Sequence, residues 1–372
     1  MPATKVIVNI PGERPYDVRI GEGVLADLGN ALNSTPGLEN VVRYLIISDT
    51  NVSPLYLKAC KEALAQAGIK SCDISIPAGE DSKSLNVATE IWEAMALLKL
   101  NRDCAVIALG GGVVGDLAGF VGSTYMRGLP IVQVPTTLLS MVDSSVGGKT
   151  GVNLNAGKNL VGTFTQPRYV CADTSTLTTL DEREWTCGCG EIAKSAIIDS
   201  DDFFFWLLEH AAELAARETD VVNEAIVRCV VFKAGVVSAD KTESCGVREC
   251  LNYGHTLGHA IEKLTRYGTY SHGACVAEGM RFAAQLAHRL VGCSEELVQT
   301  QAVLLDTLNL PPLDWCAAPE AILEVMKHDK KTRDGHVRFV LPRDVGDWVI
   351  EDVADTVILE ELETWALTKG TM

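Results

Sequence analysis

Hydrophobic and polar positions in the first half of the chain alternate between short apolar runs and longer segments with helical spacing. Short β-branched runs are typical of buried strands, whereas apolar residues three and four apart are typical of helices. The predicted strands are 5–9, 42–47, 71–76, 104–109 and 131–134, and the predicted helices are 54–67, 85–98 and a segment from Val113. Such alternation predicts an α/β domain with a largely parallel sheet.

From about Leu180 onward, helical spacing replaces this alternation. The predicted helices are 203–217, 221–237, 275–291, 295–308 and 321–328, with one short β-like run at 337–341. The change of pattern falls near 177–181, and no repeat or low-complexity linker is visible. We therefore predict two domains, an α/β domain over residues 1–178 and a mostly helical domain over 179–372.

Composition narrows the class of protein. The 372 residues include 47% hydrophobic residues, enough for two well-filled cores. A formal net charge of -17 argues against a general nucleic-acid binder and against binding to an anionic membrane surface. Because no apolar run is long enough to span a bilayer, we expect a soluble protein.

Twelve cysteines are scattered along the chain, and no apolar leader precedes them. Free thiols in a reducing compartment are the better expectation, with the cytoplasm as the default location. Cys187 and Cys189 are too closely spaced for a zinc knuckle, and no second pair follows. We assign them a structural role.

Three of the seven histidines crowd into one short window, His255, His259 and His272. If residues 251–260 are helical, His255 and His259 lie on one face. Imidazole is a common ligand for zinc-like ions, and a catalytic site usually takes three protein ligands. A carboxylate is then expected elsewhere in the chain. The alternative is that an isolated pair of this kind lies in the core or on a helix surface without any ion.

A glycine cluster, Gly110 to Asp116, contains G-x-G-x-x-G directly after a predicted strand and before a predicted helix. Glycine lets backbone amides approach a pyrophosphate, and the helix N-terminus favours its charge. The match is partial, because no acidic residue ends the next strand to bind a ribose hydroxyl. Asp49, at the end of an earlier strand, is a candidate for that role. A tight structural turn is the alternative.

The segment Ser144 to Thr150 resembles a phosphate-binding P-loop but lacks its first glycine, since Asp143 occupies that position. A nucleotide kinase is therefore disfavoured. The same polar, glycine-rich stretch holds Lys149, Lys158 and Asn159, which we expect to contact a ligand from loops. The lysines could equally be solvated, as most lysines are.

Taken together, these segments resemble the 3-dehydroquinate synthase family, a branch of the sugar-phosphate cyclases. The resemblance covers nearly the whole chain. Its blocks are GGGVVGDLAGF (110–120), YMRG (125–128), VPTTLLSMVDSSVGGKTGVN (134–153), GKN (157–159), GEIAKSAII (190–198), RECLNYGHTLGHAIE (248–262), HGACVAEGM (272–280) and HDKKTRDGHVRFVLP (328–342). It implies a Rossmann-like N-terminal NAD-binding α/β domain and a mostly α-helical C-terminal metal-binding domain, with the active site in the cleft.

The resemblance also implies the site residues. The metal ligands fall on Glu191, His255 and His272, which supplies the missing carboxylate. The NAD contacts fall on Asp49, Glu80, Lys83, Gly112, Val113, Gly115, Asp116, Thr136, Thr137, Lys149, Lys158, Thr176 and Thr179. The substrate-binding and catalytic residues fall on Asp143, Lys149, Asn159, Lys194, Lys233, Arg248, Asn252 and His259, with Lys330 or Lys331. Arg127 is expected to contribute across a homodimer interface.

The activity implied is that of a phosphate-eliminating carbon–oxygen lyase of the shikimate pathway. Its substrate, 3-deoxy-D-arabino-heptulosonate 7-phosphate, would be oxidised transiently by NAD, lose phosphate, be reduced again, and close to 3-dehydroquinate by an intramolecular aldol reaction. A zinc or cobalt ion would act as a Lewis acid. The substrate carries a carboxylate and a phosphate, so Arg248 suits the carboxylate and the lysines suit the phosphate.

Three alternative functions remain. Other sugar-phosphate cyclases share the NAD and metal sites but act on substrates that lack a carboxylate, which would leave Arg248 and Asn252 without an anionic partner. A metal-dependent polyol dehydrogenase would have little use for the lysine cluster. A noncatalytic nucleotide-binding protein would not need the metal ligands. The sequence departs from the family pattern at Cys187–Gly190 and at Ser195, and neither departure removes a ligand.

Overall fold

The computed structural model describes residues 3–328 and 336–369. The chain forms two compact units. The sheet unit comprises Met1–Asp181 and Val222–Thr242, and the helical unit comprises Glu182–Val221 and Glu243–Met372. Helix α7 (Thr219–Ala239) runs through the second junction, so most of it packs with the sheet unit. The boundary proposed at residue 178 stays a prediction.

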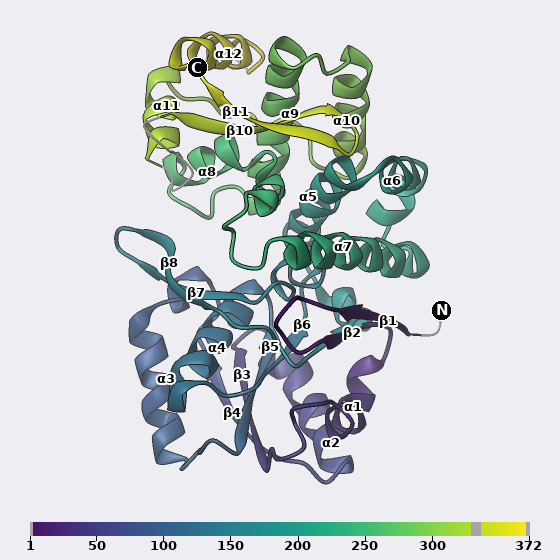
Figure 1. Ribbon diagram of the computed structural model, residues 1–372, viewed down its shortest axis with the longest axis vertical. Coiled ribbons are helices and arrows are strands. Elements are labelled where there is room, and N and C mark those ends of the chain that lie inside the picture. Colours follow the sequence, from purple (N-terminus) through teal and green to yellow (C-terminus); the bar gives the residue numbers. More distant parts are fainter. Residues whose placement is uncertain (1–2, 329–335, 370–372) are drawn as a thin grey trace. The chain divides into compact units, whose positions relative to one another are not determined.

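The sheet unit is built on seven hydrogen-bonded strands within the described residues, in the order β1-β2-β9-β6-β5-β3-β4 (Figure 1). All neighbours are parallel except β1 and β2. The strands are β1 (Thr4–Val8), β2 (Tyr16–Gly21), β3 (Arg43–Asp49), β4 (Lys70–Ile76), β5 (Cys104–Gly110), β6 (Ile131–Pro135) and β9 (Tyr169–Asp173). The predicted parallel α/β sheet is confirmed.

Alternation along the central strands builds two cores, one on each face of the sheet. In β3, Tyr44 and Ile46 pack toward α1 (Leu28–Asn33) and α2 (Lys58–Gln66). Leu45 and Ile47 pack on the other face toward α3 (Leu85–Leu97) and α4 (Gly112–Thr124). Because both faces are covered, the strands are continuously apolar, as the buried run Cys104–Gly110 illustrates.

The order of the strands reverses between β3 and β5. The chain leaves β3 for β4 on one side and then returns to build β5, β6 and β9 on the other. At such a reversal the loops after neighbouring strands part, and this leaves a crevice at their carboxyl ends where ligands bind in open α/β sheets. Asp49 ends β3 and Gly110 ends β5. The two predicted NAD segments therefore lie at the same edge of the sheet.

The helical unit contains helices around one small hairpin. The helices are α5 (Glu182–Asp199), α6 (Asp201–Ala215), α8 (His255–Leu264), α9 (His272–Leu290), α10 (Glu295–Thr307), α11 (Pro319–Lys327) and α12 (Asp355–Leu367). A short 3-10 segment, η7 (Val247–Asn252), precedes α8. The hairpin pairs β10 (Val337–Asp344) with β11 (Asp347–Val353), and the first of these contains the predicted β-like run. No helix in the described ranges has both the length and the apolar character needed to cross a bilayer.

One prediction about local structure is wrong. Lys149, Lys158 and Asn159 do not lie in loops, because they belong to an antiparallel hairpin of β7 (Lys149–Leu154) and β8 (Gly157–Phe164). Asp143 lies in a helical turn, η5 (Ser140–Ser144). The hairpin packs closely on α4, where a Cβ added at Gly119 would come within 2.4 Å of the Thr150 methyl carbon. This long-range packing leaves no local sequence signal.

Candidate active site

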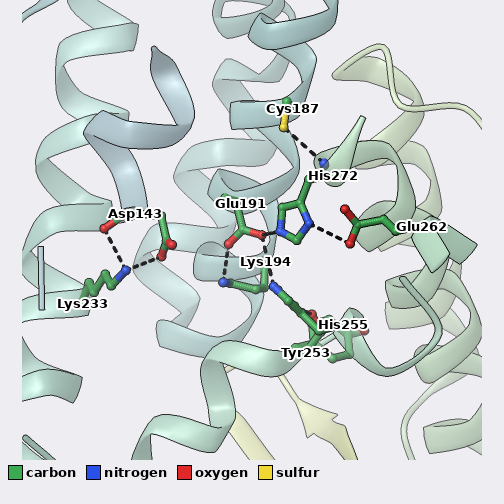
Figure 2. Close-up of polar contacts among 10 residues, drawn as sticks. Asp143, Cys187, Glu191, Lys194, Lys233, Tyr253, His255, Glu262 and His272 are labelled. Carbon is green, nitrogen blue, oxygen red and sulfur yellow. Dashed lines mark hydrogen bonds and ion pairs between the residues drawn. The ribbon is translucent and has the colours of Figure 1, made fainter. Parts of the chain in front are cut away.

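Three helices of the helical unit bring the predicted metal ligands together. Glu191 lies in the middle of α5, His255 is the first residue of α8, and His272 is the first residue of α9. Glu191 Oε1 lies 3.6 Å from His255 Nε2 and 3.5 Å from His272 Nε2. One ligand atom from each residue falls in a group compact enough to hold a metal ion (Figure 2).

Each of these ligands adjoins a glycine at which two helices touch. A Cβ at Gly190 would lie 2.8 Å from the Gly273 carbonyl oxygen, and one at Gly273 would lie 2.2 Å from the Cys187 carbonyl oxygen. A Cβ at Gly254, which has φ +76°, would lie 2.5 Å from the Val276 carbonyl oxygen. Since no other residue fits these contacts, the glycines let α5 and α8 approach α9 closely enough for the side chains to meet.

Hydrogen bonds set the tautomer of each imidazole. His255 Nδ1 lies 3.0 Å from the Tyr253 carbonyl oxygen, to which it donates. His272 Nδ1 lies 3.3 Å from Glu262 Oε2 and donates to that carboxylate. In both rings Nε2 is then the nitrogen that faces Glu191, and it is the nitrogen that would bind an ion once any proton on it is released.

The electrostatics of the cluster suit a cation. The Glu191 side chain is 2% exposed, and its Oε1 accepts no hydrogen bond from the described residues. Burial favours the neutral acid, but Lys194, which forms an ion pair with Oε2, and His272 outweigh it and hold the pKa of Glu191 well below its usual range. A buried, ionised oxygen with no donor is costly unless a cation satisfies it.

His272 shows the complementary shift. Burial on its own lowers the pKa of His272, but the carboxylates of Glu191 and Glu262 outweigh burial and raise the pKa to about 10. The donor set of two imidazole nitrogens and one carboxylate oxygen is typical of catalytic zinc and suits cobalt equally. The residues present therefore fit a divalent metal ion.

Further predicted residues of the helical unit lie on α5, on α8 and on η7, which precedes α8. His259 follows His255 by one turn of α8, and its ring centroid lies 5.3 Å from that of His255 and 6.2 Å from that of His272. Lys194 and Arg248 are buried, with 2% and 1% of each residue exposed. Arg248 and Asn252 belong to η7, and Asn252 is half-buried. Lys330 and Lys331 fall outside the described residues.

In the sheet unit, the glycine cluster forms the junction between β5 and α4. Gly111 is the residue before the helix, Gly112 and Val113 begin it, and Gly115 packs against Gln133 of β6. Thr136 and Thr137 follow β6, where Pro135 pairs with Gly110. The junction thus presents free N–H groups of a helix N-terminus at the edge of the sheet.

Asp49 lies at the same edge, where its Oδ1 accepts hydrogen bonds from Asn51 N at 2.8 Å and Val52 N at 2.9 Å. These contacts fix the turn after β3 and hold the carboxylate in place. Thr176 and Thr179 follow β9 in η6 (Thr174–Thr179), and the Thr179 hydroxyl lies 2.6 Å from that of Tyr56. The contact between Tyr56 and Thr179 was not predicted, because a single tyrosine in a helical segment does not indicate a partner far away in the sequence.

Polar contacts join the remaining residues predicted to bind NAD. Lys83 forms an ion pair with Asp116, and burial raises the pKa of Asp116 although Lys83 opposes the shift. Glu80 Oε1 accepts a hydrogen bond of 2.7 Å from Asn153 Nδ2, and Asn153 Oδ1 accepts one of 2.9 Å from Asn159 N. Asn153 therefore links the turn after β4 to the β7–β8 hairpin. Asn153 was not predicted as a site residue, although it ends the motif block 134–153, which was its one signal in the sequence.

A second lysine–carboxylate pair joins α7 to η5. Lys233 Nζ donates to Asp143 Oδ1 at 2.6 Å and to the Asp143 carbonyl oxygen at 2.7 Å (Figure 2). Lys149 and Asn159 are exposed and Lys158 is half-buried on the hairpin. Arg127 is exposed and has φ 69°, next to Met126 with φ 51°. Two consecutive left-handed residues that are not glycine are uncommon and mark a strained turn.

The cysteines of α5 are structural in their surroundings. Burial raises the pKa of the Cys187 thiol to about 12 and also raises that of Cys189. Cys187 Sγ accepts a hydrogen bond of 3.3 Å from Gly273 N, directly beside His272. All twelve cysteines are free thiols, as expected.

Comparisons with known proteins agree with this arrangement. The model of the 3-dehydroquinate synthase N-terminal domain matches residues 73–187, and that of the C-terminal domain matches residues 188–332. The chain is 42% identical to a 3-dehydroquinate synthase of Nitrosomonas europaea over 95% of this chain and 94% of the relative.

Two solved structures resemble the fold over nearly its whole length. A 2-deoxy-scyllo-inosose synthase complexed with carbaglucose-6-phosphate, NAD+ and Co2+ has a TM-score of 0.86 at 29% identity, covering 97% of this chain and 99% of that one. A 2-epi-5-epi-valiolone synthase from Streptomyces hygroscopicus subsp. jinggangensis 5008, with NAD+ and Zn2+ bound, has a TM-score of 0.85 at 28% identity with the same coverage. The chain belongs to the 3-dehydroquinate synthase family.

Proposed function

We propose that this protein is a 3-dehydroquinate synthase that uses NAD and a divalent metal ion to convert 3-deoxy-D-arabino-heptulosonate 7-phosphate to 3-dehydroquinate and phosphate. The observation that carries the proposal is the convergence of Glu191, His255 and His272 beside the buried Lys194, in a chain of this family. The proposal includes all the site residues predicted above.

In the helical unit, Glu191 Oε1 and the two Nε2 atoms would hold the ion. When bound, the ion supplies Lewis-acid polarisation of the substrate oxygens. Lys194 holds Glu191 ionised and directs a positive charge toward the same cluster. His259, one turn from His255, would place its imidazole beside a hydroxyl of the substrate.

In the sheet unit, the N-terminus of α4 would bind the NAD pyrophosphate, and Asp49 would accept a hydrogen bond from a ribose hydroxyl. When bound, NAD supplies reversible hydride transfer. Lys83 and Asn153 hold Asp116 and Glu80 in place at this edge. Lys233 and Asp143 orient each other and provide a charge pair for the substrate.

The positive charges of the predicted substrate-binding residues favour a sugar phosphate that also carries a carboxylate. Arg248, with 1% of the residue exposed, presents a planar guanidinium in a protein whose net charge is -17. Such a fork matches a carboxylate, while the ammonium groups of Lys149 and Lys194 act as point charges toward the phosphate or hydroxyl groups. A cyclase whose substrate lacks the carboxylate is the second candidate, because the two cyclase structures above are similar over the whole fold.

The test supplies protein, Co²⁺, the heptulosonate phosphate and NAD at one-tenth of the substrate concentration. We expect phosphate release to continue well beyond one turnover per NAD, with 3-dehydroquinate as the product and no accumulation of NADH. A dehydrogenase would stop at one NADH per NAD. Turnover of sedoheptulose 7-phosphate or glucose 6-phosphate in preference to the acid would favour the second candidate.

We also propose a homodimer in the cytoplasm. The exposed Arg127 on its strained turn supports a role at a subunit interface, and the free thiols support a reducing compartment. Sedimentation of the wild type and of Arg127→Ala tests the first point. A wild type that sediments as a monomer would contradict it.

A further inference from the structure

We propose that Glu262 is a positioning residue that fixes His272 for metal binding, an inference that rests on the metal site proposed above. Glu262 lies on α8, and its Oε2 is 3.3 Å from His272 Nδ1. The Glu262 side chain is 12% exposed and that of His272 is 29% exposed. Figure 2 shows this carboxylate on the side of the imidazole ring opposite Glu191. One ring is thus held between two carboxylates with different roles.

The same geometry decides between positioning and direct ligation by Glu262. His259, Glu262 and His272 also form a group that could hold an ion. However, the two nitrogens of His272 point apart, Nε2 toward Glu191 at 3.5 Å and Nδ1 toward Glu262 at 3.3 Å.

The atoms that face His272 Nε2 form the better set of ligands for an ion. It contains the buried Glu191 Oε1, which accepts no hydrogen bond from the described residues, and the second imidazole nitrogen, His255 Nε2. An ion at that position leaves Nδ1–H free to donate to Glu262. We therefore assign Glu262 to the hydrogen bond and not to the ion.

A comparison of the two histidines shows what the carboxylate adds. His255 donates to the neutral carbonyl oxygen of Tyr253, whose own hydroxyl is held by Gln301 Oε1 at 2.5 Å. His272 donates to a charged acceptor instead. A carboxylate polarises the N–H group more strongly than a carbonyl does, so the opposite nitrogen becomes more basic and binds a cation more tightly. His272 is therefore the histidine whose affinity for the ion depends on one nearby side chain.

The negative charge of Glu262 and its ability to accept a hydrogen bond can be tested separately by substitution. Glu262→Gln keeps the size of the side chain and an oxygen that can accept from Nδ1, but it removes the charge. Glu262→Ala removes both. Loss of such an outer partner typically weakens metal binding about 10- to 100-fold. We expect the dissociation constant for Co²⁺ to rise about 10-fold in Glu262→Gln and about 100-fold in Glu262→Ala.

The experiment titrates the metal-free full-length protein with Co²⁺ against a chromophoric chelator and records the visible absorption of the bound ion. Glu360→Gln is the matched control, because it removes one carboxylate that pairs with Arg289 on the exposed side of α12. Thermal melting of each metal-free variant checks folding. The expected order of affinity is wild type and Glu360→Gln, then Glu262→Gln, then Glu262→Ala, with an altered Co²⁺ spectrum in the last two.

Two outcomes would overturn the inference alone. In one, the wild type binds one ion and both Glu262 variants bind it equally well with the same spectrum. In the other, the wild type binds two ions and Glu262→Gln loses one of them, which would make Glu262 a ligand. A wild type that binds no ion would contradict the proposed function as well, so the two failures are distinguishable.

Discussion

In the sheet unit, the residues predicted to meet NAD stand where parallel strands end, whereas in the helical unit the residues predicted to meet a metal stand on three packed helices. The sheet unit offers backbone N–H groups, and its glycines, which have no side chains, leave these groups accessible to a ligand. The helical unit offers charged side chains, and glycines there serve to bring helices together. Added bulk at a glycine should therefore weaken ligand binding in the sheet unit and helix packing in the helical unit, where loss of a charged side chain should also remove a metal or substrate contact.

A buried carboxylate beside a lysine occurs in both regions, with opposite consequences. Burial raises the pKa of Asp116 despite its ion pair with Lys83, and the nearby Glu80 adds to the shift. The pKa of Glu191 is held low, because His272 supplements Lys194. The pKa values of the two carboxylates thus shift in opposite directions, although each carboxylate forms an ion pair with a lysine.

The largest expected effect comes from removing a donor of the helical cluster. His272→Ala should abolish metal retention and lower the rate of phosphate release about 1,000-fold or more, since a Lewis-acid ion contributes several kcal/mol to the transition state. Elemental analysis and the phosphate assay measure both. His210→Ala, which removes a histidine paired with Glu213 outside the cluster, should change neither. Normal metal content in His272→Ala would remove this residue from the ligand set.

A smaller loss is expected at the predicted carboxylate contact. Arg248→Ala should lower kcat/KM for the acid substrate about 30-fold or more, because truncating one partner of a buried charge pair costs about 2 kcal/mol or more. The metal content should stay normal. Arg248→Lys tests whether charge alone suffices, and Arg289→Ala controls for loss of a surface arginine. Unchanged kinetics in a folded Arg248→Ala would take this residue out of the site.

The free energy of unfolding tests whether the glycines between the helices of the helical unit are required for their close packing. Gly273→Ala should lower the free energy of unfolding by about 1–3 kcal/mol, because its Cβ would lie 2.2 Å from a backbone oxygen that cannot move freely. Gly235→Ala in α7 is the control. No neighbouring atom of the described residues outside its own helix backbone lies within 4 Å of a Cβ at this position, so Gly235→Ala should stabilise the protein by about 0.5–1 kcal/mol. Denaturant titration gives both values, and equal effects would contradict the close-packing argument.

The smallest effect is expected at the glycine junction of the sheet unit. Among the described residues, a Cβ at Gly112 would meet Ser144 alone, at 3.3 Å from its hydroxyl oxygen, so the fold should tolerate Gly112→Ala with a small shift of that side chain. The added bulk would keep the NAD pyrophosphate from the N-terminus of α4. We expect the dissociation constant for NAD to rise about tenfold, which corresponds to about 1.4 kcal/mol. Calorimetry measures it, and the Co²⁺ affinity should not change. Equal NAD binding would favour a purely structural turn.

Much of this architecture was predictable because local patterns report on local structure. The apolar runs of β3 to β6 and the spacing of α9 and α10 are signals of periods two and 3.6. The β7–β8 hairpin was missed because its glycines and lysines have no such period. Glu262 was missed because a glutamate near the end of an amphipathic helix is ordinarily solvated. In retrospect, a glycine beside each of Glu191, His255 and His272 was a readable signal of close helix contacts.

The sequence by itself determined the α/β and helical halves of the chain, the strand–glycine–helix junction and, through its motif blocks, the family. Tertiary structure decided which nitrogen of each histidine is directed toward Glu191, how far that carboxylate is removed from water, and which acceptors hold the rings. Periodicity is a property of neighbouring residues along one backbone. Ligand geometry and pKa depend on the distances and burial that arise only when helices from distant parts of the chain pack together.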